Sequence, residues 1–363
     1  MQAAIFSSVP YLGPVDPGWP VSGSCYSIEV AERSMELGLE QLQLGDELGF
    51  DWVTVAEHHY GPLALTPNPM VIAGALTQRV WRARIALLGA TIPILNPVRV
   101  AEEFAMLDTM TCGRVVAGML RGTANEYVTY NVNPAESRER FEEALKLIRA
   151  CWTEPEPFGW QGRYYEYRSI SIWPRPVQQP HPPVLMSGSS PESGEMAARN
   201  RVRLGFAVTT VPLAAQAADH YRAEATRAGW APAPEDILYR VSAHVADSDE
   251  EAFDDLRARG GDVRPRVSRE NTTIDEGALR SGYYGRDAEA QRARVARRSL
   301  EEQISLGSLI AGGPDTVLSQ VRSIRDAIGC GILEVIFAPL GRDKTLRAIE
   351  LFGTRVLPRM REL

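Results

Sequence analysis

The chain has 363 residues, of which 44% are hydrophobic and 23% are charged, and its formal net charge is −7. This composition is ordinary for a globular protein and excludes intrinsic disorder, a collagen-like chain and a disulfide-stabilised miniprotein. The length allows two or three domains, or equally a single barrel with insertions. The sequence contains no concentrated run of Lys and Arg, so we expect no nucleic-acid partner.

Membrane insertion, export and metal binding are not expected either. The longest apolar stretch, Ile85 to Leu95, is well short of the ~20 residues that span a bilayer. The N-terminal sequence MQAAIFSSVP lacks the positive patch and long apolar core of a signal peptide. Scattered thiols without a CxxC pair indicate neither zinc nor a redox dithiol and are typical of a reducing cytosol, which predicts a cytoplasmic protein. The four cysteines are Cys25, Cys112, Cys151 and Cys330.

Short apolar strands alternate with amphipathic helices along the chain. The predicted strands are Ala3–Phe6, Trp52–Ala56, Ile85–Ala90, Val115–Gly118, Val184–Met186, Leu204–Val208, Leu238–Val245 and Leu333–Ala338. The helices that follow them are predicted from the apolar spacing and from prolines suited to a first helical turn. They cover Ala31–Leu48, Pro69–Thr77, Pro97–Asp108, Ser137–Cys151, Pro191–Arg201, Pro212–Gly229, Pro314–Ile328 and Asp343–Leu357.

Eight strands, each followed by a helix, predict a closed (β/α)₈ TIM barrel of the α/β class. A doubly wound open sheet is the alternative, but it usually has fewer strands and a Gly-rich turn after the first. Here Ser7, Ser8 and Val9 follow the first strand, so we favour the barrel, as one domain over residues 1–363. Insertions are predicted after strand 1 (residues 10–27), after helix 4 (residues 160–173) and after strand 7 (residues 246–300). The last of these is a possible active-site lid.

Three polar residues, Glu57, His58 and His59, directly follow the second predicted strand. In barrels the active site is built from the loops at the carboxyl ends of the strands, and histidine is the natural acid or base near neutral pH. Adjacent residues at a strand end point in opposite directions, which predicts that one histidine faces the site while the other bonds within the wall. We interpret Glu57 as an internal partner for a cation or a backbone amide.

A second group of polar residues follows the fourth and fifth strands. Arg121 and Gly122, together with serines 189, 190 and 193, would make an anion-binding site, because arginine matches phosphate geometry and a helix N-terminus adds amide donors. The segment SGSSPES is an equally good helix cap, which needs no ligand. The residue types alone leave both interpretations open.

The string AEHH, the run LLGATIPILNPVRVAEEFAMLDTMTCGRVVAGMLRG from Leu87 to Gly122, and SGSSPES together resemble the bacterial luciferase family of flavin-dependent monooxygenases. The EHH string alone is weak, whereas EHH followed by NPVRxAEExAxLDxMxxGR and RG is specific. The resemblance implies reduced FMN as a dissociable co-substrate, supplied by a separate flavin reductase. It also implies that O2 and the reduced flavin form a flavin hydroperoxide, which oxygenates a small organic substrate such as a ketone, an aldehyde or a secondary-metabolite intermediate.

The resemblance also implies roles for individual residues. Arg121 would bind the FMN phosphate with Gly122, Ser190 and Ser193, while Ser189 stands where a luciferase has a glutamate. His58 would govern formation or use of the hydroperoxide, with His59 and Glu57 beside it. The flavin ring would lie against residues 88–90, that is Leu88, Gly89 and Ala90, with a non-proline cis peptide bond near Leu88–Gly89.

Two other functions fit the same residues: a deazaflavin-dependent hydride-transfer oxidoreductase on the same barrel, and a non-catalytic flavin-binding protein. We expect a homodimer, which the Ala-rich helices at Met70–Thr77 and Pro97–Asp108 could form, although their apolar residues could equally face the barrel. The substrate itself cannot be read from residue types.

Overall fold

Eight parallel strands form the centre of the protein in the computed structural model, which describes residues 1–15, 18–207, 209–260 and 298–363. Each strand pairs with the next, and the last pairs with the first, so the sheet closes into a barrel and confirms the predicted fold. In ring order these strands are β1 (Gln2–Phe6), β2 (Trp52–Val55), β3 (Arg84–Thr91), β4 (Val115–Leu120), β7 (Val184–Ser187), β8 (Arg203–Phe206), β9 (Ile237–Val245) and β11 (Ile332–Phe337).

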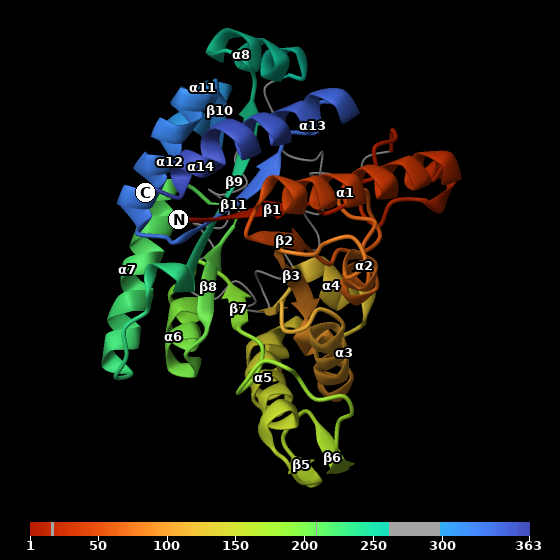
Figure 1. The fold of residues 1–363 in the computed structure, drawn as a ribbon. Helices are drawn as coiled ribbons and strands as arrows, with labels where there is room; N and C mark the ends of the chain where they lie inside the picture. Colours follow the sequence, from red (N-terminus) through yellow and green to blue (C-terminus); the bar gives the residue numbers. More distant parts are fainter. Residues whose placement is uncertain (16–17, 208, 261–297) are drawn as a thin grey trace.

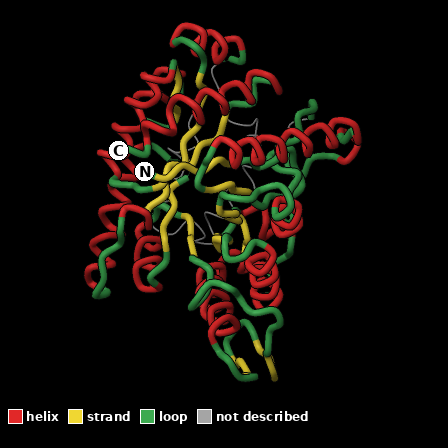
Figure 2. The backbone as a smooth tube through the Cα atoms, viewed as in Figure 1, coloured by secondary structure: helices red, strands yellow, loops and turns green. Residues whose placement is uncertain are grey.

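Helices surround the strands, as Figures 1 and 2 show. The chain termini lie side by side, with the Met1 ammonium 3.5 Å from the Met360 carbonyl oxygen (Figure 1). The helices are α1 (Ile28–Leu48), α2 (Pro69–Leu76), α3 (Pro97–Met110), α4 (Ala124–Thr129), α5 (Ser137–Thr153), α6 (Pro191–Asn200), α7 (Val211–Arg227), α8 (Asp249–Ala258), α11 (Leu300–Ser305), α12 (Pro314–Ile328), α13 (Arg342–Leu351) and α14 (Leu357–Met360).

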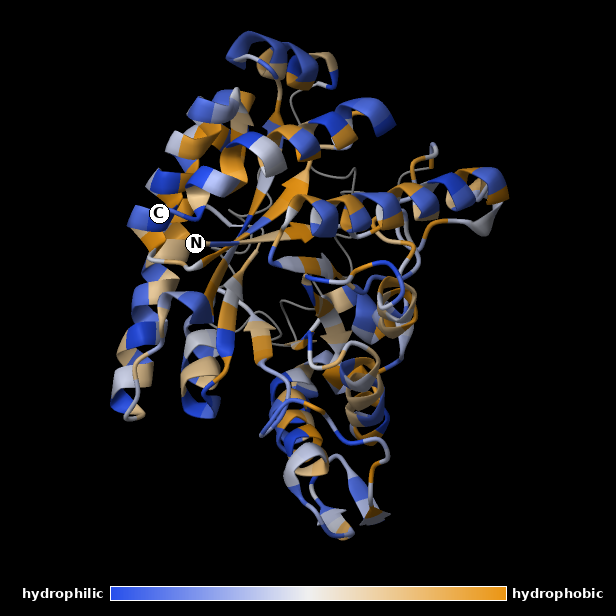
Figure 3. Cartoon of the chain, viewed as in Figure 1, coloured by the Kyte–Doolittle hydropathy of each residue, from blue (hydrophilic) through white to orange (hydrophobic). Residues whose placement is uncertain are grey.

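Local sequence signals set where the helices begin and end. The Ser27 hydroxyl accepts the Val30 amide at the start of α1, and Gly49 ends that helix in the left-handed conformation at φ 89°. Asn68 before Pro69 and Asn96 before Pro97 cap α2 and α3 in the same way, with proline in the first turn. Apolar residues gather on the central strands and polar ones on the outer helix faces (Figure 3). No helix in the described parts of the chain is long and apolar enough to cross a membrane.

Several elements differ from the sequence prediction. A ninth parallel strand, β10 (Leu309–Gly312), pairs with the second half of β9, and the short helix α4 was not predicted. The expected last helix is α13 followed by a π-helical turn (Phe352–Val356) and α14. The insertion predicted at residues 160–173, after the fourth predicted helix, is the antiparallel hairpin β5 (Phe158–Gln161) and β6 (Glu166–Ile170). The hairpin lies at the outer end of α5 in Figure 1.

The predicted insertion at 246–300 is described only in part. Helix α8 and the first residue of α11 fall within it. Residues 261–297 lie outside the described residues, and the possible lid falls mainly on them.

Strand β3 contains an irregularity beside the loop that carries the histidines. Its register with β4 shifts between Leu88 and Ala90, and Gly89 packs directly against the backbone at the end of β2. A Cβ atom on Gly89 would lie 2.7 Å from Ala56 Cα and closer still to the backbone nitrogen of Glu57. The two chain segments can approach this closely only because Gly89 has no side chain.

The predicted non-proline cis peptide bond at Leu88–Gly89 is wrong. The cis bonds among the described residues all precede proline, at Trp19–Pro20, Trp173–Pro174 and Gln179–Pro180. A glycine at the register shift allows the tight contact with the end of β2 while the bond remains trans.

We predict that Gly89→Ala destabilises the protein by about 1–3 kcal/mol, because the new methyl group would overlap backbone atoms that cannot rotate away. Urea-induced unfolding in the absence of flavin measures the change. Gly74→Ala in helix α2 is the matched control, since nothing lies within 4 Å of its added Cβ and alanine favours the helix. Equal stability of the two variants would contradict the packing argument.

Candidate active site

The predicted site residues all lie at the carboxyl end of the barrel. Glu57, His58 and His59 follow β2, and Leu88 to Ala90 lie just before the last residue of β3. Arg121 and Gly122 follow β4, and serines 189, 190 and 193 follow β7. These four strands are consecutive neighbours in the sheet, so the loops after them lie next to one another. No group of three or more His, Cys, Asp or Glu side chains in the described parts of the chain could hold a metal ion.

Glu57 and His59 form a buried pair in the wall of the barrel mouth. His59 Nε2 is 3.0 Å from Glu57 Oε1, and the side chains are 3% and 2% exposed. The second carboxylate oxygen, Oε2, accepts the backbone N–H of Thr91 at 3.1 Å. The ring of Tyr130 packs edge-on against His59 with 5.1 Å between ring centroids. Glu57 therefore connects the loop after β2 to the end of β3 and fixes the His59 ring.

His58 points the other way and bonds to a residue that the sequence analysis did not select. Its Nδ1 atom is 3.1 Å from Oε1 of Glu126 in helix α4, and its side chain is 29% exposed, against 2% for Glu126. Glu126 Oε2 accepts the backbone N–H of Thr123 at 2.6 Å and the Thr123 hydroxyl, which caps α4. The two adjacent side chains point in opposite directions at the strand end, so His59 bonds within the wall and His58 contacts Glu126 of α4.

The environment of Glu126 keeps its carboxyl group charged. Burial acts to raise the pKa of Glu126, but hydrogen bonds and charge interaction with His58, together with the bonds from Thr123, outweigh it and leave the pKa below 4.5. An ionised carboxylate only accepts hydrogen bonds, so the proton of the His58–Glu126 contact resides on Nδ1. This assignment leaves His58 Nε2 for a ligand.

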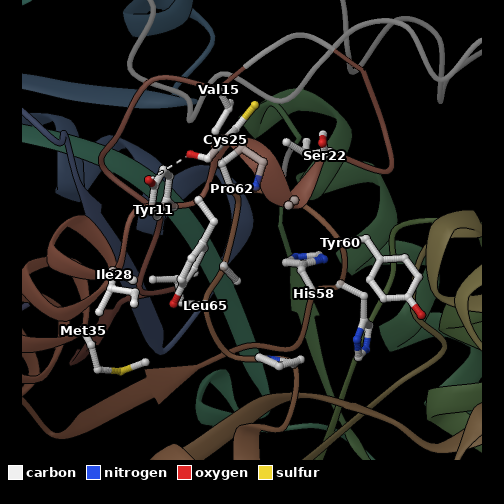
Figure 4. Close-up of a pocket in the computed structure, with 18 of the residues that line it drawn as sticks. Tyr11, Val15, Ser22, Cys25, Ile28, Met35, His58, Tyr60, Pro62 and Leu65 are labelled. Atoms are coloured by element: carbon white, nitrogen blue, oxygen red, sulfur yellow. Dashed lines mark hydrogen bonds between the residues drawn. The ribbon is translucent and has the colours of Figure 1, made fainter.

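His58 also lines a cavity of about 640 Å³ between the loop after β1 and the loop after β2. Figure 4 shows His58 and Tyr60 on one side of this cavity and Tyr11, Ile28 and Met35 on the other. Most of its wall is apolar, and two tyrosine rings, Tyr11 and Tyr26, stack with centroids 5.8 Å apart. A cavity of this size and lining is typical of a site for a small organic molecule.

The residues after β4 and β7 come together through the starts of helices α5 and α6. Gly118 pairs with Leu185, so Arg121 and Gly188 each stand three positions past that pair. Arg121 donates to the hydroxyl of Ser137, the first residue of α5, at 3.3 Å. Arg138, the next residue, lies 3.8 Å from Glu192 in the first turn of α6. Arg121 is therefore placed on the side of the barrel mouth where α6 begins.

Helix α6 begins with the serines that the sequence analysis selected. Ser190 is its N-cap and accepts the amide of Ser193 at 3.3 Å, and the two hydroxyls lie 3.0 Å apart. The cap interpretation of SGSSPES is confirmed by these bonds. The hydroxyls of Ser189, Ser190 and Ser193 and the first amides of α6 remain compatible with an anion, since a cap serine can rotate toward a ligand.

The barrel interior holds charged residues that the sequence analysis missed. Glu334 of β11, which is 0% exposed, accepts the Thr54 hydroxyl at 2.5 Å and pairs with Arg240 of β9. The signal was present, because Arg240 in ILYRVSAHV and Glu334 in ILEVIF are single charges inside otherwise buried strands. Charges in such positions are rarely accommodated unless they are paired.

The barrel and a histidine held by a carboxylate at its carboxyl end define an α/β-barrel enzyme site. Residues 24–329 match the profile of the family described as luciferase-like monooxygenase. The chain therefore belongs to this family of luciferase-like monooxygenases, as the resemblance predicted.

Individual relatives agree with this assignment. The 4-hydroxyprotoasukamycin monooxygenase of Streptomyces nodosus subsp. asukaensis is 28% identical over 342 residues, covering 88% of this chain and 85% of the relative. The F420-dependent glucose-6-phosphate dehydrogenase of Gordonia bronchialis is 28% identical over 335 residues, with coverages of 88% and 91%. The monooxygenase RslO1 of Streptomyces bottropensis has a similar solved structure, with a TM-score of 0.76, 26% identity and 99% coverage of each chain.

Other relatives match over a shorter stretch. The uncharacterized protein y4wF of Sinorhizobium fredii is 29% identical over 180 residues, and the chain spans 52% of its length.

We predict that Glu126→Gln lowers the free energy of unfolding by about 1–3 kcal/mol at neutral pH, because the buried acceptor loses its charge. The folded-state pKa lies below the ordinary 4.5, so this stabilisation is present above pH 4.5 and is lost as the pH falls through the folded-state value. The difference between wild type and variant should therefore shrink in acid, as urea unfolding at several pH values would show. The exposed Glu36→Gln is the control, and a pH-independent difference for Glu126→Gln would refute the argument.

Proposed function

We propose that this protein is a monooxygenase that uses reduced FMN and O2 to oxygenate a small organic substrate. The observation that carries the proposal is the placement of His58, whose Nε2 is left unused by Glu126 at the wall of a 640 Å³ apolar cavity. The substrate class, a ketone, an aldehyde or a secondary-metabolite intermediate, follows from the family resemblance.

The residues present are chemically suited to FMN. A phosphate needs several donors and a positive charge, which Arg121, the hydroxyls of Ser190 and Ser193 and the first amides of α6 would supply. Gly188 leaves room beside Ser193, because a Cβ there would overlap the Ser193 side chain. The Thr209 hydroxyl after β8 is buried and has no hydrogen-bond partner among the described residues, which supports a ligand at the barrel mouth. When bound, reduced FMN supplies the electrons that activate O2.

The chain's own residues would control water and protons. The apolar cavity wall would disfavour water beside the reacting groups, and a dry site strengthens every polar contact made within it. His58 would accept or donate a proton at Nε2, while Glu126 holds the ring by Nδ1. We propose that Glu57 and His59 act as positioning residues, since both are bonded within the wall.

The F420-dependent relatives support a second candidate, a deazaflavin-dependent hydride-transfer oxidoreductase. It would use the same barrel mouth without oxygen. The likeness to a monooxygenase over 99% of both chains supports the first candidate over the second.

We propose two further properties that the family resemblance implies. A separate flavin reductase would supply the reduced FMN, because it is expected to dissociate after each turnover. A homodimer would cover exposed apolar side chains on α2 and α3, namely Val71, Met106 and Met110, and the mass of the native protein in solution checks it. The cytoplasmic location stays a prediction.

An anaerobic titration with reduced FMN and then with reduced F420, followed by tryptophan fluorescence, tests the function. We expect reduced FMN to bind more tightly, and oxygen uptake with a panel of ketones, aldehydes and phenols then identifies the substrate class. A preference for F420 would support hydride transfer instead. Binding of neither would refute both candidates.

We predict that Arg121→Ala weakens reduced-FMN binding by about 1.5–3 kcal/mol, the contribution of a hydrogen bond to a charged group. The same titration gives the dissociation constants. Arg227→Ala is the matched control, because Arg227 is 71% exposed at the last residue of α7, near the opposite end of the barrel. An unchanged affinity for Arg121→Ala would overturn the phosphate assignment.

A further inference from the structure

The ion pair of Arg240 and Glu334 lies inside the barrel. Arg240 of β9 and Glu334 of β11 are partners in register, and Glu334 also accepts the Thr54 hydroxyl from β2. Strand β1 lies between β11 and β2 in the sheet, so a bond between Glu334 and Thr54 must pass through the interior of the closed barrel. Both carboxylate oxygens of Glu334 are therefore used within the barrel.

The guanidinium of Arg240 reaches the carboxyl end, where the active site is built. Its Cζ atom lies 3.8 Å from the ring centroid of Phe6, the last residue of β1. Phe6 pairs with Thr54, four positions before His58. The Arg240 side chain is 16% exposed whereas Glu334 is completely buried, so the guanidinium lies at the boundary between the barrel core and the barrel mouth.

The donors of Arg240 are only partly used. Arginine carries five N–H donors, and here the Nε–H group donates to the Glu334 carboxylate. Neither Nη1 nor Nη2 donates a hydrogen bond to any of the described residues. Glu334 and the Phe6 ring fix the plane of the group, so these remaining donors are preorganised.

A purely structural role would be to neutralise Glu334. That role requires only the contact through Nε, and a buried ion pair can often be replaced by apolar residues without loss of stability. Neutralisation therefore does not explain why an arginine extends to the barrel mouth with terminal donors that bond to none of the described residues.

We propose that Arg240 binds an anionic oxygen of a planar ring system at the floor of the active site. The anion would belong either to the reduced flavin ring, which is negatively charged at neutral pH, or to a phenolate, enolate or carboxylate of the substrate. The inference rests on the proposed function of this site. It adds a cation at the barrel floor, separate from Arg121 and from His58.

The test compares dissociation constants in Arg240→Met with those of the wild type, measured anaerobically by tryptophan fluorescence. The ligands are reduced FMN against oxidised FMN, and 2-naphthoate against neutral 2-naphthamide. We expect the variant to lose about tenfold or more in affinity for reduced FMN or for 2-naphthoate. Affinity for oxidised FMN, whose ring is neutral, and for 2-naphthamide should change little. Selective loss for reduced FMN assigns the flavin as the anion, and selective loss for 2-naphthoate assigns the substrate.

Two further variants separate this role from folding. Arg203→Met is the matched control, because Arg203 lies at the amino end of the barrel, over Trp52 and paired with Asp236. The double variant Arg240→Met with Glu334→Gln removes the uncompensated buried charge. It should show the same selective loss, whereas wild-type affinities in the double variant would overturn the proposal.

The outcomes also separate this inference from the proposed function. A wild type that binds reduced FMN while the Arg240 variants bind every ligand equally well refutes the role of Arg240 alone. A wild type that binds neither flavin refutes the proposed function itself.

Discussion

The site depends on the close contact between the ends of β2 and β3. Gly89 packs against the backbone of Ala56 and Glu57, and the Thr91 amide donates to the Glu57 carboxylate. With the backbone of Glu57 held in this way, its side chain turns into the wall and takes His59 as its partner. The next side chain along the strand direction, His58, is then directed away from that wall and toward the cavity.

Much of this arrangement could be predicted from the sequence, because it depends on local patterns. Apolar spacing and prolines gave eight strands and their helices, and the adjacent histidines gave opposite side-chain directions. The pairing of His58 with Glu126 could not be predicted, because the two residues are 68 positions apart and meet only through the strand order. The capping box of Thr123 and Glu126 was readable, but a cap alone does not indicate a partner for a histidine.

The cis bond expected at Leu88–Gly89 was wrong because it was carried over from the family resemblance and did not follow from the residues. At this position the strand has a register shift and a trans bond instead. The pairing of Arg240 with Glu334 could be predicted only in part. The alternation of side chains along a strand places both residues inside the barrel, but it does not identify them as partners.

Three buried carboxylates explain how the polar groups of the site are oriented. Glu57, Glu126 and Glu334 are at most 5% exposed, and each must be compensated, because an unpaired charge in such surroundings is costly. Each has one ring or guanidinium nitrogen as partner, from His59, His58 and Arg240 respectively. Each also accepts from one threonine, namely Thr91, Thr123 and Thr54, and Thr123 donates both its backbone N–H and its hydroxyl. Because each carboxylate binds a specific nitrogen, it also determines which nitrogens are left over. The remaining nitrogens of His58 and Arg240 belong to partly exposed side chains at the barrel mouth. The buried acidic residues therefore determine which donors a ligand at the barrel mouth would contact.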